Sequence, residues 1–383
     1  MEIALTYDPR WRYTPQGRTS SWASLDTVEY VSVLLEELGM TVLPLKADDA
    51  FETRLADIKH KYARPVVFWL NEFMPTASGR DMFTVRVIEK LGMMHTGPGT
   101  EALATGLDKE ATKEVFRGLG LPTPESYVVP LGDFSPIDEP ASWEGCAIVK
   151  PLLQGNSRGM DGSSVVLAGD AKAIREKVQR VHDEFAEPAL VEKYIGGEDA
   201  REFTVPMLIS HDGGIAELPI TEIDLSQIPL AQGRFRFLTH DIKDEKYYLK
   251  IPARLSPGTT TRIYREVRQI IDAIGCKDMT RVDLRADSTR MYYLEVNTNP
   301  GKNRFSYLTT SAYSLGLEYP QIIALIPYQA MLKYGLEPPA QLEEAVEPVM
   351  ALFETRPPSG KVAHRRSAKS WLGRAVAYGD QIA

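Results

Sequence analysis

The 383-residue chain has 44 lysines and arginines against 52 aspartates and glutamates, a net charge of −8, and 43% hydrophobic residues. This charge disfavours general binders of nucleic acid or membrane surfaces, because both are polyanions. Two cysteines, Cys146 and Cys276, exclude a disulfide-stabilised scaffold. No apolar run reaches the ~20 residues that span a bilayer, and the N-terminus lacks a signal-peptide pattern. Composition therefore predicts a soluble, cytoplasmic protein.

The first hundred residues alternate between strand and helix patterns. The predicted strands cover residues 3–7, 41–45 and 65–70, and the predicted helices cover 26–38 and 83–91. Gly39 and Gly92 follow the two helices as C-terminal stops. This β-α-β-α order predicts an open, mainly parallel sheet over residues 1–100.

The next two hundred residues predict two lobes of helices and antiparallel strands. We expect a small lobe over 101–189, whose first helix Asp108 caps, and a larger lobe over 190–336. The predicted strands cover 147–151, 163–168, 190–195, 202–209, 215–220, 280–285 and 291–296, and the predicted helices cover 109–118, 171–185 and 263–274.

The segment over residues 337–383 is interpreted as a basic C-terminal tail. It opens with Pro338 and Pro339, and residues 361–374 carry five lysines or arginines and no acid. A solvated tail is one interpretation. A docking arm for an acidic partner or for a neighbouring subunit is the other.

The most informative pattern is a predicted hairpin that carries two acids. Because strand side chains alternate between faces, Arg281 shares a face with Asp283, and Glu295 shares a face with Asn297. If the strands pair in near register, these groups converge at one end of a sheet, where their oxygens suit Mg²⁺. A solvent-facing polar surface is the alternative. The intervening side chains are expected in the core: Val282, Leu284, Leu294 and Val296.

Two lysines and a glycine-rich loop precede this hairpin. Lys113 lies on the first helix of the small lobe, and Lys150 ends a predicted buried strand, so each points either into a cleft or to solvent. The loop over 154–164 contains three glycines, whose backbone N–H groups can cover a phosphate chain. An ordinary hairpin turn is the alternative.

A rival enzyme class arises from the same loop, which contains a G-x-S-x-G pattern centred on Ser157. A serine hydrolase of this type needs a helix after the serine. A β-rich run follows instead, which disfavours that class. The sequence contains no P-loop, dinucleotide-binding or zinc-protease motif.

The order of these motifs resembles the ATP-grasp superfamily, specifically its D-alanine–D-alanine ligase-like branch. The ordered set is Asp108-Lys109-x-x-x-Lys113, Val149-Lys150-Pro151, the glycine loop, Glu192-Lys193-Tyr194, Glu202-Phe203-Thr204, Arg281-Val282-Asp283 and Glu295-x-Asn297-x-x-Pro300-Gly301. Upstream segments similar to that branch are Phe68-Trp69-Leu70-Asn71-Glu72 and His95-Thr96-Gly97-Pro98-Gly99. The resemblance covers about residues 66–335. It implies an α/β N-terminal domain with an open parallel sheet, followed by a two-lobed α+β ATP-grasp module.

The resemblance also implies an ATP site with two Mg²⁺ ions, or Mn²⁺ as the alternative metal. The implied ATP-binding residues are Lys113 and Lys150 at the α- and β-phosphates, Lys243 at the γ-phosphate, Gly155, Ser157 and Gly159 in the covering loop, Glu192, Lys193 and Tyr194 at the adenine, and Glu202 at the ribose. The implied metal ligands are Asp283, Glu295 and Asn297.

Roles at the substrates follow from the same resemblance. Arg281 matches the arginine that steadies the reacting acyl group, and Glu72 matches a residue that holds the ammonium of a first amino acid. Ser306 fits the position that grips the carboxylate of the second substrate. Lys302 and Arg304 replace small or sulfur-containing residues of the family, so they indicate a larger or more anionic nucleophile unless both face solvent.

The reaction that the resemblance implies is ATP-dependent joining of a carboxylate to an amine through an acyl phosphate. We expect amino acids or related small molecules as the substrates, ADP and phosphate as products, and a homodimer. The alternatives are D-alanine–D-alanine ligase itself and a nucleotide-binding regulatory protein without turnover. The family's opening Gly-Gly is replaced here by Tyr7-Asp8-Pro9, which leaves the first substrate open.

Overall fold

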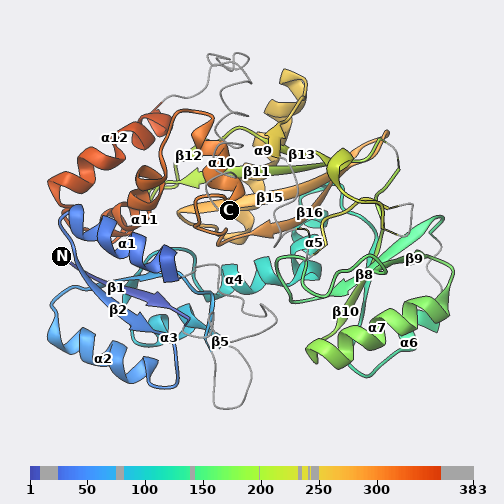
Figure 1. Cartoon of the computed structure of the whole chain (residues 1–383), viewed down its shortest axis with the longest axis horizontal. Helices are drawn as coiled ribbons and strands as arrows, with labels where there is room; N and C mark the ends of the chain where they lie inside the picture. The colour runs from blue at the N-terminus through green and yellow to red at the C-terminus, as the bar shows by residue number, and fades with distance from the viewer. Residues whose placement is uncertain are drawn as a thin grey trace.

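The computed structural model describes residues 1–8, 25–74, 82–138, 143–197, 199–231, 235–239, 242 and 250–354. Its strands form three main sheets, one for each expected unit, and the C-terminal lobe lies between the N-terminal domain and the small lobe (Figure 1). This arrangement confirms the predicted α/β domain followed by a two-lobed α+β module.

The N-terminal domain contains a four-stranded parallel sheet in the order β2-β1-β3-β6. Its strands are β1 (Glu2–Tyr7), β2 (Thr41–Lys46), β3 (Val66–Trp69) and β6 (Met94–His95), and its helices are α1 (Leu25–Glu37), α2 (Phe51–Lys61) and α3 (Thr84–Lys90). A short hairpin joins β4 (Phe73–Met74) to β5 (Met82–Phe83). The prediction missed α2 because it buries only Phe51 and Leu55, which leaves little apolar periodicity.

A late helix completes the core of this domain. Helix α11 (Tyr319–Lys333) packs with α1 on one face of the parallel sheet, while α2 and α3 cover the other face. Almost every side chain of α11 between Ile322 and Met331 is buried, because the helix also contacts the core of the C-terminal lobe through Leu208 and Leu218. Apolar residues on all sides are typical of a helix enclosed by other elements.

The small lobe is an antiparallel sheet in the order β7-β10-β8-β9, covered by two helices. Its elements are β7 (Ser126–Val129), α6 (Ser135–Asp138), β8 (Cys146–Pro151), β9 (Val165–Leu167), α7 (Ala171–Phe185) and β10 (Ala189–Lys193). The expected boundary at 189/190 separates β10 from the sheet to which it is hydrogen-bonded. The structure therefore places the end of this lobe after β10.

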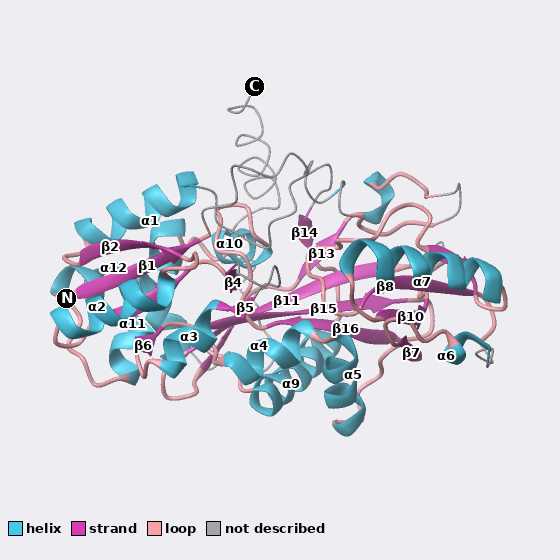
Figure 2. Ribbon diagram, turned by 90° about the horizontal axis from the view of Figure 1, so that it is seen from below, coloured by secondary structure: helices cyan, strands magenta, loops and turns pink. Residues whose placement is uncertain are grey.

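The C-terminal lobe contains the longest strands, in the order β14-β13-β11-β15-β16 with β12 beside β11. Its elements are β11 (Arg201–Ile209), β12 (Ile215–Glu217), β13 (Thr221–Ile223), the 3₁₀ turn Leu225–Gln227, β14 (Lys250–Pro252), α9 (Pro257–Ile274), β15 (Met279–Ala286), β16 (Met291–Asn297) and α10 (Tyr307–Tyr313). Helices α4 (Thr100–Leu107), α5 (Lys109–Gly118) and α9 cover one face of this sheet (Figure 2). The segment expected to open the small lobe thus packs on the larger lobe.

The expected C-terminal tail begins as a helix. Residues 340–354 form α12 (Ala340–Glu354), which buries Leu342, Val346 and Val349 in the same core as α11. The basic stretch between 361 and 374 lies outside the described residues.

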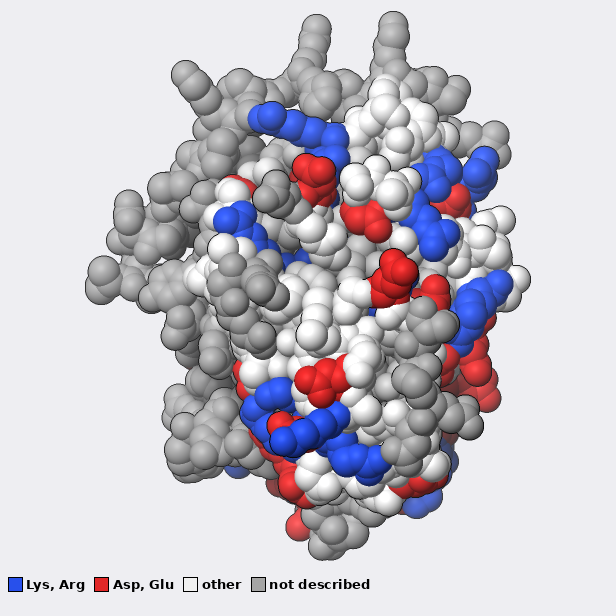
Figure 3. Space-filling model, turned by 90° about the vertical axis from the view of Figure 1, so that its right-hand side faces the viewer, with Lys and Arg blue, Asp and Glu red and all other residues white. Residues whose placement is uncertain are grey.

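Among the described helices, none combines the length and apolar character that a membrane crossing requires. Positively and negatively charged side chains are interspersed on the face at the small-lobe end of the molecule (Figure 3).

Candidate active site

The predicted hairpin forms and brings its polar residues together. Strand β15 pairs antiparallel with β16, and the register sets Asp283 directly opposite Glu295 and Arg281 directly opposite Asn297. The Nδ2 of Asn297 donates to Asp283 at 3.1 Å, and the Nε of Arg281 lies 3.4 Å from the same carboxylate. Two acids and their polar neighbours therefore converge on one face, as the strand alternation predicts.

A β-bulge changes one part of this prediction. The pairing shifts between Asp283 and Leu284, because Leu284 faces Tyr293 and leaves Leu294 without an opposite residue. Val282, Leu284 and Val296 enter the core as expected, whereas Leu294 lines a cavity beside Glu295. An extra residue in one strand re-aims side chains in this way and is common next to active sites.

The neighbouring strand β11 extends the polar face by two residues. Thr204 lies opposite Asp283, and its Oγ1 donates to that carboxylate at 2.7 Å. Glu202 lies opposite Arg285 and accepts from its Nη1 at 2.8 Å. Cross-strand pairs of this kind fix the positions of both acids before any ligand binds.

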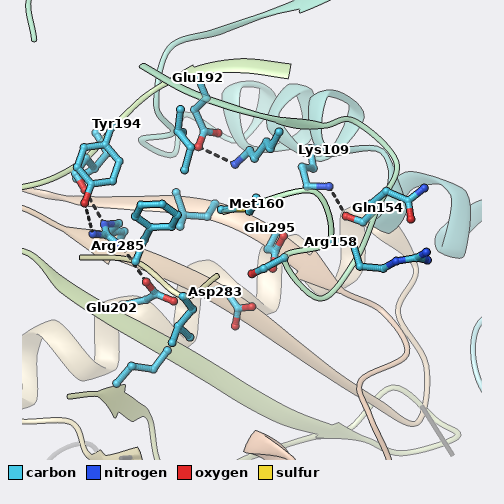
Figure 4. A pocket seen from close by; sticks show the side chains of 18 of the residues that line it. Lys109, Gln154, Arg158, Met160, Glu192, Tyr194, Glu202, Asp283, Arg285 and Glu295 are labelled. Carbon is cyan, nitrogen blue, oxygen red and sulfur yellow. Dashed lines mark hydrogen bonds and ion pairs between the residues drawn. The ribbon is translucent and has the colours of Figure 1, made fainter. Parts of the chain in front are cut away.

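These residues form the floor of a cleft between the two lobes, with about 880 Å³ of empty space that is partly open to solvent. Tyr194, Arg285 and Glu202 lie at one end, and Lys109, Gln154 and Arg158 lie at the other (Figure 4). Asp283 and Glu295 project from the sheet between these ends (Figure 4). Further lining residues are Ile148, Lys150, Ser157, Met160, Glu192, Phe237, Leu238, Leu294 and Tyr307.

A buried carboxylate joins two of the predicted functional residues. Glu192 is 3% exposed and lies 2.7 Å from the ammonium of Lys150 and 2.6 Å from that of Lys113. Burial would raise the pKa of Glu192, but the two ammonium groups outweigh it and hold the pKa below its usual range. Lys150 lines the cleft, whereas Lys113 is fully buried behind it and donates to Thr123 and to the Pro124 carbonyl.

Lys109, one helical turn before Lys113, is the α5 lysine that reaches the cleft. Its Nζ donates to the carbonyl oxygens of Pro151 at 3.1 Å, Leu152 at 3.2 Å and Gln154 at 2.5 Å. Burial lowers the pKa of Lys109 to about 8, although Glu295 raises it in part. The prediction of a phosphate contact by Lys113 is therefore not supported by its position, since its ammonium faces Glu192 and the backbone instead.

The glycine-rich loop lies at the end of the cleft that Lys109, Gln154 and Arg158 line, and it has a specific conformation. Asn156, Ser157 and Gly159 have positive φ values of 54°, 55° and 74°. A Cβ on Gly159 would lie 2.5 Å from Pro151 and 2.7 Å from Phe185, so only glycine fits there. Glu187 accepts from Leu153 N and Gln154 Nε2 and holds the start of the loop. Ser157, Arg158 and Met160 thereby face the cleft.

The opposite end of the cleft is organised around Arg285, which the sequence analysis did not single out. Its guanidinium donates to Ile195 O at 2.5 Å, Arg236 O at 2.6 Å and Tyr194 Oη at 3.1 Å, in addition to Glu202. A signal was present, because Arg285 continues the alternation of Arg281 and Asp283 along β15. The side chain is 5% exposed.

Comparisons with known proteins agree with this geometry. The family model for the D-Ala–D-Ala ligase C-terminus matches residues 118–326. The chain belongs to the D-alanine–D-alanine ligase family of ATP-grasp enzymes. It is 29% identical over 322 residues to the D-alanine–D-alanine ligase of Gluconobacter oxydans, covering 83% of this chain and 98% of the relative. It is 30% identical to that of Aromatoleum aromaticum over 66% and 76% of the two chains.

Solved structures agree at the level of the fold. The D-alanine–D-alanine ligase of Bacillus anthracis matches with a TM-score of 0.64 at 18% identity, over 88% of this chain and 99% of that one. The same enzyme complexed with ATP matches with a TM-score of 0.63. These structural matches confirm the fold, while the family model and the sequence relatives confirm the predicted ATP-dependent ligase class.

Only some of the predicted ATP-binding residues of the ligase line the cleft. Those that line the cleft are Lys150, Ser157, Glu192, Tyr194 and Glu202. Gly155, Gly159 and Lys193 are not among the residues that line the cleft, and the backbone N–H of Lys193 donates to Glu125 O. Lys243 lies outside the described residues.

Three of the four predicted substrate residues of the ligase lie in the chain segment that follows β16. Ser306 caps α10, because its Oγ accepts from Thr309 N and shares a hydrogen bond with Thr309 Oγ1. The guanidinium of Arg304 lies 4.2 Å from the ring centroid of Tyr30 and 5.6 Å from that of Tyr319. Glu72 follows β3, and Lys302 is buried beside Trp69.

The donor set of the ligase fits the magnesium that the family implies. Asp283 and Glu295 are carboxylates that face each other directly across two strands, so they concentrate two negative charges at a place where a divalent cation can neutralise them. Mg²⁺ binds through one or two carboxylates together with substrate phosphates. Asn297 provides an amide oxygen on the same face.

Arg285→Met is expected to raise the Kd of the ligase for ATP by about 10- to 100-fold, the loss of one or two charge-assisted hydrogen bonds. Because Arg285 fixes Glu202, the variant should also discriminate less between ATP and 2′-deoxy-ATP. Isothermal titration with both nucleotides measures this. Arg290→Met, at an exposed arginine on the following turn, is the control. Unchanged discrimination would contradict the assigned role.

Proposed function

We propose that the protein activates the carboxylate of one small acid with ATP and joins it to the amine of a second substrate. The observation that carries this proposal is the facing pair Asp283 and Glu295 in one cleft with Lys109 and Lys150. Bound Mg²⁺ would neutralise triphosphate charge, and Asp283, Glu295 and Asn297 would hold it. The two lysines supply further positive charge at the phosphates.

The proposed reaction has two steps. A carboxylate oxygen of the first substrate attacks the γ-phosphorus of ATP, ADP leaves, and an acyl phosphate forms. The amine nitrogen of the second substrate then attacks the acyl carbon, loses a proton, and expels inorganic phosphate, which leaves an amide. Arg281 can balance the charge that develops on the acyl oxygen. The loop that contains Ser157 and Arg158 would exclude water from the acyl phosphate.

Amino acids are the proposed substrates, because the relatives at 27–30% identity are named D-alanine–D-alanine ligases. Joining of two D-alanine molecules is the narrower candidate within this class. A homodimer and a cytoplasmic location complete the proposal by family membership. Small-angle scattering of the purified chain tests the dimer.

The purified protein is expected to release ADP and phosphate only when an acid and an amine are both supplied with MgATP. A coupled ADP assay over a panel of D- and L-amino acids, with mass spectrometry of the products, tests this. A peptide whose mass equals the two substrates minus water is the expected product. Tight MgATP binding without turnover for any pair would favour a regulatory nucleotide-binding protein instead.

A further inference from the structure

An aromatic ring in the cleft lies close to two cations. Tyr307, the first residue of α10, lines the cleft and is 7% exposed. The centroid of its ring is 4.9 Å from the guanidinium carbon of Arg281 on β15 and 4.6 Å from the ammonium of Lys250 on β14. Both distances are within the ~6 Å over which the face of an aromatic ring attracts a cation. One tyrosine thus contacts two cations that come from different strands.

The tyrosine itself is held in place by its neighbours. Its ring packs in an apolar cluster with Ile223 and Leu238, which line the same cleft. The Nζ of Lys250 also donates to the carbonyl oxygen of Phe305, two residues before the tyrosine. Side chains at a functional site keep a fixed geometry when packing and hydrogen bonds lock the residues around them. Tyr307 therefore has the fixed position that a support for another side chain requires.

Arg281 is the cation that the proposed reaction uses at the acyl oxygen. Its side chain is mostly buried, and its Nε lies 3.4 Å from the Asp283 carboxylate. A charge-assisted hydrogen bond between such groups usually measures about 2.7–2.9 Å. The ion pair with Asp283 is therefore too long to set the orientation of the guanidinium by itself. Other neighbours must contribute to that orientation, and the Tyr307 ring is one of them.

An aromatic ring suits this role better than a further acid would. A second carboxylate beside the guanidinium would cancel the positive charge that Arg281 needs for the acyl oxygen. A ring attracts the cation through its quadrupole and carries no net charge, so the charge of the guanidinium stays available. The Lys250 ammonium adds positive charge at the same ring. This arrangement therefore orients Arg281 without neutralising it.

We propose that Tyr307 is a positioning residue, whose ring holds the Arg281 guanidinium where it meets the acyl oxygen during amide formation. This inference rests on the proposed ligase function, and it concerns a residue that the sequence analysis did not single out. Because Tyr307 acts through Arg281, loss of the ring should slow the chemical step and leave substrate binding nearly unchanged. A tyrosine that instead contacted the second substrate would change the KM of that substrate.

The first test compares Tyr307→Leu with Tyr307→Phe. Leucine is apolar but has no ring, so kcat is expected to fall about 5- to 30-fold, while the KM of each substrate stays within about twofold. Phenylalanine keeps the ring and should restore kcat to within about threefold of the wild type. Tyr62→Leu is the control, because it removes a ring that lies 5.2 Å from the Lys61 ammonium at the end of α2. That control should leave kcat unchanged.

The second test changes the electrons of the ring and leaves its shape almost intact. Phenylalanine that carries one, two or three fluorine atoms is introduced at position 307 by amber-codon suppression. Fluorine withdraws electron density from the ring face and weakens its attraction for a cation, so kcat should fall with each added fluorine. This series separates the proposed role from packing, and it decides the question even if Tyr307→Leu folds poorly. In an Arg281→Met background, Tyr307→Leu should lower kcat less than about twofold further.

A kcat that stays constant along the fluorinated series, or a Tyr307→Leu defect confined to the KM of the amine substrate, would overturn the proposal. A third measurement needs no turnover. The ring current of Tyr307 should shift the NMR resonance of Arg281 Hε, which Arg281→Lys identifies by its loss. Tyr307→Leu should move this resonance, and an unmoved resonance would also overturn the proposal. Failure of the proposed function is a separate result, in which no acid and amine pair releases ADP in the wild type.

Discussion

Glu295→Gln is expected to reduce kcat by about 10²- to 10³-fold, the usual cost of removing one preorganised charged group from a transition-state site. The side chain keeps its size, but the facing pair of Asp283 and residue 295 loses one of its two negative charges. Mg²⁺ and the triphosphate would then bind in a site with one carboxylate. Single-turnover measurement of ADP formation at saturating MgATP checks the expectation.

The same variant should be at least as stable as the wild type when magnesium is absent. Directly opposed like charges destabilise a strand pair by roughly 0.2–1 kcal/mol, of which Arg281 beside Asp283 offsets a part, and Glu295→Gln removes the remainder. Thermal unfolding in EDTA and in Mg²⁺ measures both states. Glu52→Gln, at a partly exposed acid of α2 that pairs with Lys90 far from the cleft, provides the control. A variant that is inactive because it is unfolded in EDTA would argue against a metal-binding role for Glu295.

Lys113→Met is expected to lower the free energy of unfolding by about 3 kcal/mol, because removal of one partner leaves a buried charge less well compensated. The loss is at the low end for buried pairs since Glu192 retains Lys150 at 2.7 Å. The ATP affinity of the folded variant should change little, because the Lys113 ammonium faces Glu192 and not the cleft. Urea unfolding and ATP titration measure the two effects.

Lys109→Met is the paired variant, and the opposite pattern is expected. Its side chain lines the cleft at the proposed phosphate position, so ATP should bind about 10- to 100-fold more weakly with a smaller loss of stability. In a Glu192→Gln background, Lys113→Met should cost less than in the wild type, which a double-mutant cycle detects. Equal losses of ATP affinity in both lysine variants would contradict this distinction and would indicate that Lys113 also contacts the phosphates.

The hairpin was predictable because its signals are local. Side-chain alternation assigns faces, and the turn over Asp287–Arg290 sets the pairing of Leu284 with Tyr293. The bulge that follows moves the partner of Asp283 from Leu294 to Glu295. The parallel sheet was predictable for the same reason, since apolar runs and glycine stops mark its strands and helices. The bulge at Leu294 was not, because one extra residue in a strand leaves the hydrophobic pattern almost unchanged.

The choice between Lys109 and Lys113 illustrates the opposite case. Residues four apart lie on the same face of a helix, so the sequence places both lysines toward the cleft. Glu192, which is 79 residues after Lys113 in the sequence, pairs with the Lys113 ammonium in the folded protein and keeps it out of the cleft. Helix α12 was missed for another reason: two prolines before it suggested a tail, although Leu342, Val346 and Val349 have helical spacing.

The placement of α11 has a consequence for synthesis on the ribosome. The first strands to emerge need a helix that ends at Lys333 to cover one face of their sheet. Until that helix leaves the exit tunnel, the nascent N-terminal domain exposes Ile3, Leu5 and Phe68, which are the kind of apolar surface that chaperones bind. Any fragment that stops before residue 319 would keep this surface open permanently.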